Sequence, residues 1–142
     1  MDYFITKSTI FMEFNGESTI VHEKDKKIFF KGEKLEDILN NSCIYYGSTL
    51  RGRIISSKQF IGTNYKVPIL VSEKNNLLFF YIKDNDSIYW FNFLSIKSYQ
   101  KIEGKLLIVF NNNERLILNA SYTIFHNQIL RCSRLMVVYS TR

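Results

Sequence analysis

Short runs of apolar, β-branched and aromatic residues, separated by polar turns, make up most of the chain. The runs at residues 3–14 and 18–23 flank Asn15-Gly16, the dipeptide most typical of a tight β-hairpin. A third run, at residues 27–31, follows a charged turn. This pattern predicts antiparallel strands joined by short turns in the N-terminal part of the chain.

From Pro68 onward, further apolar runs predict a second series of strands. The turns between them are rich in Asn, Asp and Gly, residues that tolerate left-handed backbone conformations. The predicted strands cover residues 68–72, 77–82, 87–96, 105–110 and 115–120.

Two segments between these series have helical character. Residues 34–41 place three apolar side chains on one side of a brief helical turn. Residues 48–62 predict a longer helix with Ser48 or Thr49 as its N-cap and Gly62 at its end. The glycine and the pair of isoleucines inside this segment argue against that helix. Its proposed inner face consists of Leu50, Ile54, Lys58 and Ile61.

The hydrophobic period changes again in the last twenty residues. Phe125, Ile129, Cys132 and Met136 recur at helical spacing, and Ser121 is the candidate N-cap. The predicted fold class is therefore α+β. It consists of a mainly antiparallel β-sheet, one or two internal helices and a C-terminal amphipathic helix packed on the sheet.

Length and composition predict one globular domain over residues 1–142, with 46% apolar and 15% aromatic residues. The N-terminus does not have the pattern of a signal peptide, and no apolar run is long enough to span a membrane. Cys43 and Cys132 lie far apart and show no metal-ligand spacing with His22 or His126. We expect two reduced thiols in a cytoplasmic protein and no cofactor or metal, although a disulfide between the two stays possible.

Positive charge is concentrated in the second part of the chain. Residues 1–41 have a net charge of −2 and residues 42–142 a net charge of +8, which together make the overall +6. All six arginines lie in the second part. Arginine suits phosphate groups and narrow grooves, so this distribution fits a nucleic-acid partner as well as it fits a plain solvated basic surface.

No catalytic set of acid pair, activated nucleophile or metal cluster stands out, so we expect that the protein is not an enzyme. The stretch SCIYYGSTLRGR at residues 42–53 has the glycine spacing of a phosphate-binding loop. Such a loop continues with Lys and Ser/Thr, whereas Arg53 and Ile54 stand here. A nucleotide-hydrolysing site is therefore excluded.

Three segments in order resemble the competence transcription factor ComK family of low-GC Gram-positive bacteria. They are residues 42–53, with Cys-x-Tyr-Tyr-Gly-Ser and Gly-Arg, residues 65–80, with Lys-x-Pro-Ile, and residues 121–131, with Ser-Tyr-x-x-Phe-x-x-Gln. The resemblance implies a cytoplasmic DNA-binding activator of genes for DNA uptake and transformation. It also implies binding to paired A/T-rich boxes, largely through the minor groove, as a homo-oligomer. A proteolytic adaptor and RNA polymerase are the further partners implied, and no membrane.

Relatives in this family carry a tail beyond the position of Arg142. The resemblance therefore implies DNA binding with weak activation, as in a short paralogue that modulates a full-length relative. The alternative is a pleckstrin-homology-like barrel that binds a protein or an anionic lipid, because many strands followed by a final helix describe that fold too.

The expected DNA contacts follow from the resemblance and from local chemistry. A glycine-hydroxyl helix start leaves backbone N–H groups for an anion, and neighbouring cations contact phosphates or an A/T-rich minor groove. The alternative is that the glycines only form a tight turn. The predicted side-chain contacts are Arg51, Arg53, Lys58, Lys66, Arg131 and Arg134, and the predicted backbone contacts are Gly47, Ser48 and Gly52.

Overall fold

The structure is a computed structural model that describes residues 3–62 and 66–142. Two antiparallel sheets form in this part of the chain, one in the order β3-β2-β1-β6-β5-β4 and one in the order β7-β8-β9. The strands are β1 (Thr9–Phe14), β2 (Thr19–Glu23), β3 (Lys27–Phe30), β4 (Ile69–Ser72), β5 (Leu77–Asp84), β6 (Ser87–Asn92), β7 (Ile96–Ile102), β8 (Lys105–Phe110) and β9 (Arg115–Leu118). The helices are α1 (Leu35–Tyr45), α2 (Leu50–Ile61) and α3 (Tyr122–Thr141), with a short 3-10 turn η1 (Phe93–Ser95). The predicted α+β class is confirmed.

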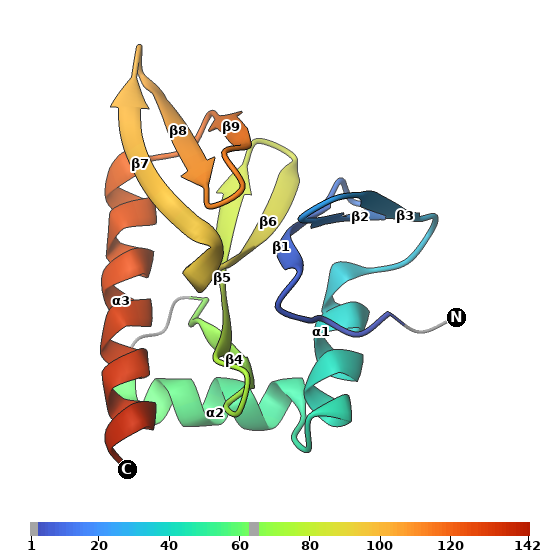
Figure 1. Ribbon diagram of the computed structural model, residues 1–142, viewed down its shortest axis with the longest axis vertical. Coiled ribbons are helices and arrows are strands. Elements are labelled where there is room, and N and C mark those ends of the chain that lie inside the picture. The colour runs from blue at the N-terminus through green and yellow to red at the C-terminus, as the bar shows by residue number, and fades with distance from the viewer. Residues whose placement is uncertain (1–2, 63–65) are drawn as a thin grey trace.

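Most of the larger sheet is buried on both faces, which explains its nearly continuous apolar runs, whereas its edge strand β3 is partly exposed. In β1, Phe11 faces a core that includes β8 and α3, while the next residue, Met12, faces a core that includes α1. In β6, Phe91 pairs with Phe11 and Trp90 pairs with Met12, so the alternation continues across the sheet. Figure 1 shows α3 along one side of the two sheets and α1 on the opposite side of β1 and β6.

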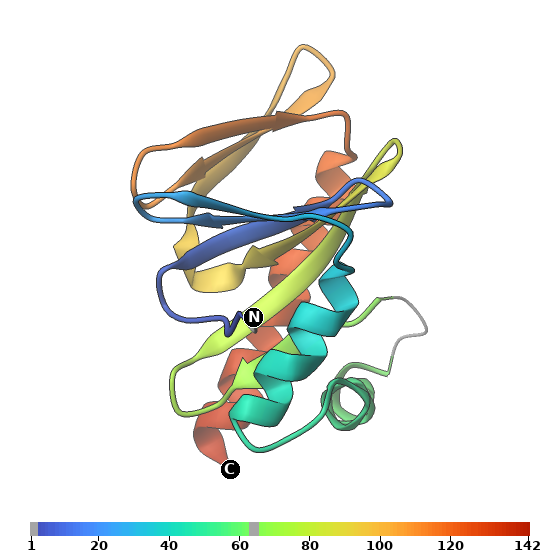
Figure 2. The same ribbon diagram turned by 90° about the vertical axis from the view of Figure 1, so that its right-hand side faces the viewer.

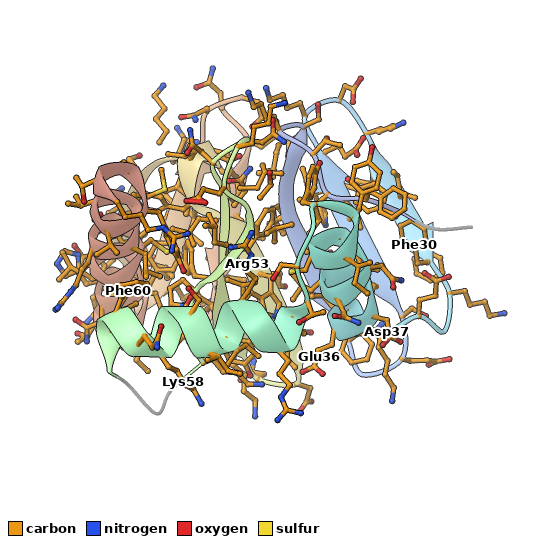
Figure 3. All side chains as sticks on the ribbon, turned by 90° about the horizontal axis from the view of Figure 1, so that it is seen from below. Phe30, Glu36, Asp37, Arg53, Lys58 and Phe60 are labelled. Carbon is orange, nitrogen blue, oxygen red and sulfur yellow. The ribbon has the colours of Figure 1, made fainter. Side chains whose placement is uncertain are left out.

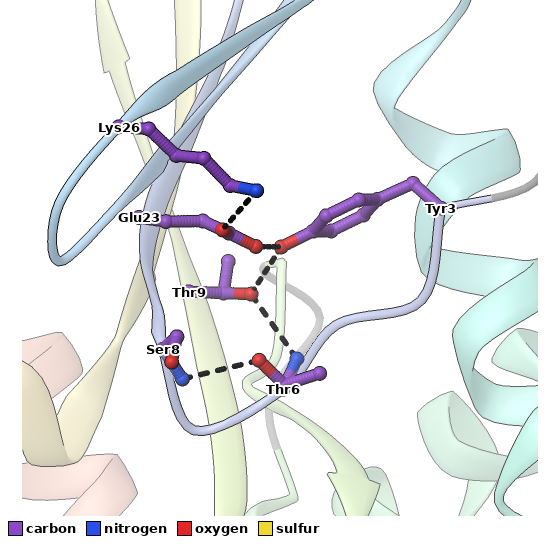
Figure 4. Close-up of polar contacts among 6 residues, drawn as sticks. All are labelled: Tyr3, Thr6, Ser8, Thr9, Glu23 and Lys26. Carbon is purple, nitrogen blue, oxygen red and sulfur yellow. Dashed lines mark hydrogen bonds and ion pairs between the residues drawn. The ribbon is translucent and has the colours of Figure 1, made fainter.

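The predicted first strand begins later than its apolar run. Residues 3–8 form a separate segment before β1, because Tyr3 donates a hydrogen bond to Glu23 and also bonds Thr9 Oγ1 at 2.6 Å (Figure 4). The hairpin at Asn15 is also wider than the two-residue turn expected. Phe14 pairs with Thr19, and the Asn15 side-chain oxygen accepts the backbone N–H groups of Glu17 and Ser18.

The predicted helix after residue 48 is confirmed, and its glycine has a structural explanation. Thr49 is the N-cap of α2 and accepts the Gly52 N–H at 3.0 Å, and Gly62 ends the helix in the left-handed conformation. A Cβ on Gly52 would lie 3.1 Å from Thr49 Oγ1 and 3.3 Å from Ser48 Oγ. Gly52 therefore leaves room for the capping hydroxyls. The preceding helix α1 is longer than predicted, because Cys43 and its neighbour are buried and extend it to Tyr45.

The predicted strand at residues 87–96 is divided between the two sheets. Asn92 ends β6 by donating its amide to the Thr9 carbonyl and accepting the Leu94 N–H, which starts the 3-10 turn. The chain then enters β7, a strand that the apolar pattern missed because most of its side chains are polar and exposed. The prediction of one continuous strand was wrong here, since a hydrophobic pattern does not show which sheet a strand joins.

The last helix agrees with its prediction. Ser121 accepts the Ile124 N–H, and Phe125 and Cys132 are fully buried. Cys43 and Cys132 are both free thiols in different cores, so the possible disulfide does not form. Among the described residues no helix is long and apolar enough to cross a membrane. Over the same ranges the strands form two separate sheets and not the single closed barrel of the pleckstrin-homology alternative.

Candidate nucleic-acid interface

Three of the predicted cationic side chains gather around two adjoining hollows that share Lys66. The first hollow, about 380 Å³, lies between β5 and α3 and includes Lys83 and Arg131. The second, about 300 Å³, lies between α1, α2 and the larger sheet and includes Lys58 and Trp90. We call these two hollows together the basic face. Its cations are Lys58, Lys66, Lys83 and Arg131.

Gln128 holds the parts of the basic face together. Its buried amide nitrogen donates to the carbonyls of Lys66, at 3.1 Å, and Tyr81, at 2.9 Å. Its amide oxygen accepts from Arg131 Nη1 at 3.2 Å. Because buried amides need partners, these bonds connect α3, β5 and the segment before β4 in one arrangement. The positions of Lys66 and Arg131 therefore depend on Gln128.

Lys66 is the most exposed member of this arrangement, with 57% of its side chain accessible. Its ammonium lies 3.8 Å from Glu36 Oε1 and 5.5 Å from the centre of the Tyr81 ring. An ion pair between two exposed side chains contributes little to stability. Lys66 can therefore exchange Glu36 for a phosphate at small cost, and among the described residues Glu36 is the one acid that lines either hollow.

The other predicted arginines do not join the basic face. Arg51 and Arg134 are exposed and line neither hollow. Arg53 is partly buried, and its Nε is enclosed without a hydrogen-bond partner in the described part of the chain. It lies close enough to Cys43 to act on the pKa of that thiol, which burial raises to about 11 and the Arg53 charge lowers. Figure 3 shows Arg53 on the inner side of α2.

The predicted backbone contacts already have partners within the chain. Gly47 donates its N–H to the Ile44 carbonyl, Ser48 donates to the Cys43 carbonyl, and Gly52 donates to Thr49. Gly47 has a φ of +97°, which L side chains rarely adopt, so it makes the turn between α1 and α2. Anion binding by these three N–H groups stays a prediction, and the interface proposed below does not use them.

Lys83, Tyr81 and Gln128 were not among the predicted contacts. Lys83 lies just beyond the predicted strand at residues 77–82, but β5 extends to Asp84, so Lys83 and Tyr81, two positions apart, lie on one face of the sheet. Gln128 stands one helical turn after Phe125, and only the tertiary structure shows that it meets two carbonyls from other elements.

Comparison with known proteins decides the family. The sequence model of the protein family described as ComK protein matches residues 1–142. The chain belongs to the ComK family. It is 26% identical over 123 residues to the competence transcription factor of Bacillus subtilis (strain 168), across 84% of this chain. It spans 64% of that relative's length. The predicted family is confirmed, and so is the prediction that the chain is not an enzyme, because the family is one of transcription factors.

A solved structure overlaps the chain loosely. The LytTr DNA-binding domain of a methyl-accepting/DNA response regulator from Bacillus cereus has a TM-score of 0.41 and 13% identity. The overlap covers 87% of this chain and 81% of that one.

The segments that resemble ComK have structural roles in this fold. Pro68, from the second segment, accepts a hydrogen bond from the buried Ser57 hydroxyl at 2.6 Å. Ser121 and Phe125, from the third, start α3 and fill the core, and Gln128 follows as described above. Tyr65, the first residue of the second segment, lies outside the described residues. These motif residues build the fold around the basic face.

Proposed function

We propose that the chain is a DNA-binding transcription regulator of competence genes, which serve DNA uptake and transformation. The observation that carries this proposal is the match to the ComK family over residues 1–142, with a competence transcription factor among the relatives. We propose further that it binds A/T-rich boxes, largely through the minor groove. A narrow A-tract groove has an enhanced negative potential, which favours inserted cations.

The basic face supports this proposal. Lys58, Lys66, Lys83 and Arg131 give it four cations against the single carboxylate of Glu36. Lysines at the rim suit phosphate contacts, which supply most of the affinity for DNA but little sequence information. Arg131 is the member suited to the groove itself, because Gln128 fixes its direction.

The proposal includes binding as a homo-oligomer to two boxes. A symmetric dimer places equivalent surfaces at a distance that matches the spacing of the half-sites. We therefore expect that two A/T-rich boxes on the same side of the duplex bind cooperatively. Contacts with a proteolytic adaptor and with RNA polymerase, and action in the cytoplasm, belong to the same proposal.

A gel-shift titration tests the proposed function. The duplexes carry two A/T-rich boxes in phase, the same boxes shifted by about half a turn, or G/C-rich sequence, at about 50 and 200 mM salt. We expect the in-phase A/T duplex to bind most tightly. Lys66→Ala should reduce the slope of log K against log salt by about 0.9, the value for one lost phosphate contact.

Lys101→Ala is the matched control, because Lys101 is exposed on β7 and lies outside the basic face. It should bind like the parent. Equal affinity for all three duplexes would contradict sequence-specific binding. Equal effects of the two substitutions would remove the basic face from the proposal while leaving DNA binding itself in place.

A further inference from the structure

A further hollow of basic character, separate from the two hollows of the basic face, lies among the loops. It measures about 510 Å³ and has an apolar floor that includes Ile10, Leu77 and Phe110. Its rim comes from loops and turns far apart in the sequence: the segment before β1, the β2–β3, β4–β5 and β8–β9 turns, and η1. We call it the loop cleft. Its polar lining is Lys7, Lys24, Asn75, Asn76, Asn92, Ser95, Asn111 and Asn112.

The loop cleft is cationic and rich in amides. Five of the thirteen asparagines of the chain line it, and no carboxylate is among the described lining residues. Lys7 and Lys24 are exposed, and neither ammonium has an ion-pair partner within residues 3–62 and 66–142. This combination suits a ligand that carries both phosphate groups and hydrogen-bonding bases.

Some of the amides hold the loops in place. Asn111 donates to the Leu94 carbonyl at 2.7 Å, and Asn112 donates to the Lys24 carbonyl at 3.3 Å. These bonds tie the β8–β9 turn to two other loops, so the rim is organised before any ligand binds. The side chains of Asn76 and Leu94 take no part in these bonds. The Asn76 side chain makes no hydrogen bond in the described part of the chain, and Leu94 is 49% exposed.

The loop cleft and the basic face lie at opposite ends of β5. Leu77, at the start of the strand, lines the loop cleft, and Lys83, near its end, lines the basic face. Six residues of strand separate the two by about 20 Å. In Figure 2 the β2–β3, β4–β5 and β8–β9 turns gather at the left edge, whereas α2 and the β5–β6 turn lie at the right. The loop cleft and the basic face therefore lie on different edges of the molecule.

We propose that the loop cleft is a second contact site for duplex DNA, so that each chain holds two duplex segments. Lys7 and Lys24 contact phosphates, the Asn76 amide contacts a base edge, and Leu94 packs against the sugar or base surface. An asparagine amide offers both a donor and an acceptor, which matches the adenine edge. The inference rests on the proposed DNA-binding function and adds that the protein bridges DNA.

A capture experiment tests this inference. An A/T-box duplex is fixed to a surface and saturated with protein, unbound protein is washed away, and a fluorescent duplex is added. The parent should retain the second duplex. Lys7→Ala/Lys24→Ala should still bind the fixed duplex, but it should retain about tenfold less of the second, because two phosphate contacts are lost.

The matched control is Lys101→Ala/Lys105→Ala, which removes the same charge from exposed lysines outside both sites. It should capture like the parent. Asn76→Gly serves as a second variant: it removes the amide but keeps the backbone free to adopt its φ of +54°, and it should reduce capture of A/T-rich duplexes selectively.

The outcomes separate the inference from the proposed function. If the parent binds the fixed duplex but captures no second one, the inference is overturned and DNA binding stands. If Lys7→Ala/Lys24→Ala captures like the parent, bridging comes from oligomers through the basic face, and the loop cleft is overturned as a DNA site. If the parent binds no duplex at all, both proposals fall.

Discussion

Arg53 is charged and partly buried, and one of its guanidinium nitrogens has no hydrogen-bond partner among the described residues. Its Nε is enclosed without a hydrogen bond among the described residues, and the nearby Cys43 thiol is neutral at physiological pH because burial raises its pKa to about 11. A donor left unsatisfied in a protein interior costs about 1–3 kcal/mol. Because Arg53 lowers stability through this unsatisfied donor, it is a candidate for a role other than stabilising the fold.

We therefore predict that Arg53→Met raises the free energy of unfolding by about 1 kcal/mol, because it keeps the stem and removes the orphan donor. Urea unfolding measures this change, and the exposed Arg51→Met should stay within about 0.5 kcal/mol of the parent. A titration with A/T-box DNA in parallel tests the hypothesis that Arg53 contacts DNA. A fall in stability would mean that Arg53 is a structural residue.

Glu13 and His22 form a buried polar pair at the edge of the core. His22 Nε2 donates to Glu13 Oε1 at 2.8 Å, and the imidazole stacks on Phe11. The hydrogen bond from His22 is the main reason that the pKa of Glu13 lies below its ordinary value of 4.5. A lowered carboxyl pKa stabilises the fold above the unfolded value, and this contribution is lost as the pH falls through the folded value.

We expect the stability of the parent to decrease below about pH 4.5, and Glu13→Gln to flatten this part of the profile. Unfolding in urea between pH 3 and pH 7 measures the slope, on the order of one proton for this group. Glu33→Gln is the control, because Glu33 is exposed and its side chain makes no hydrogen bond in the described structure. Parallel profiles for all three proteins would contradict the assignment.

At the scale of elements, the start of α2 shows how a cap and a glycine depend on each other. Thr49 caps the helix through Gly52, and a Cβ at position 52 would crowd the same hydroxyl at 3.1 Å. An alanine in a helix ordinarily stabilises it by about 0.5–1 kcal/mol relative to glycine, whereas a lost cap costs about 1 kcal/mol. The two effects oppose each other at this position.

A double-mutant cycle separates them. Gly52→Ala alone should leave stability unchanged or lower it by up to about 1 kcal/mol, because it displaces the cap. In the Thr49→Ala background the same substitution should be stabilising by about 0.5–1 kcal/mol, since no cap remains to be displaced. Thermal melting of the four proteins measures the coupling. An equal effect of Gly52→Ala in both backgrounds would show that the cap and the glycine act independently.

At the scale of the whole molecule, both hydrophobic cores contain cysteine or tyrosine side chains whose burial favours the neutral, protonated form. Burial raises the pKa of Cys43 to about 11 and that of Tyr89 to about 12, from ordinary values of 9.0 and 10.0. Burial also raises the pKa of Tyr3 and of Cys132. The fold favours the neutral form of each group. Its contribution is fully present below the unfolded pKa and is lost as the pH rises through the folded one.

We predict that the protein loses stability steadily above about pH 9–10, because the unfolded chain releases these protons first. Tyr89→Phe should flatten the alkaline limb, and Tyr122→Phe, at an exposed position, should leave it unchanged. Urea unfolding at a series of pH values from 8 to 11 provides the measurement. If Tyr89→Phe leaves the loss of stability at alkaline pH unchanged, groups other than Tyr89 cause most of that loss.

Most elements of this fold could be predicted from the amino-acid sequence. Alternation and turn residues predicted the strands up to β6, because a strand that buries both faces is apolar throughout. Thr49, Gly62 and Ser121 marked helix ends, because capping depends on local hydrogen bonds that short motifs encode. The motifs of the three resembling segments were sufficient to predict the family.

Which of the cationic residues lie together could not be predicted and depends on how the elements pack. Lys66 and Arg131 come from separate elements and meet through Gln128, and Lys58 lines a hollow together with Lys66. Arg53, close to Lys58 in sequence, points inward instead. The loop cleft likewise joins turns that are distant in the sequence. Local patterns encode the period of an element and its ends, but the surface that elements share depends on how their buried faces pack, and no single segment contains that information.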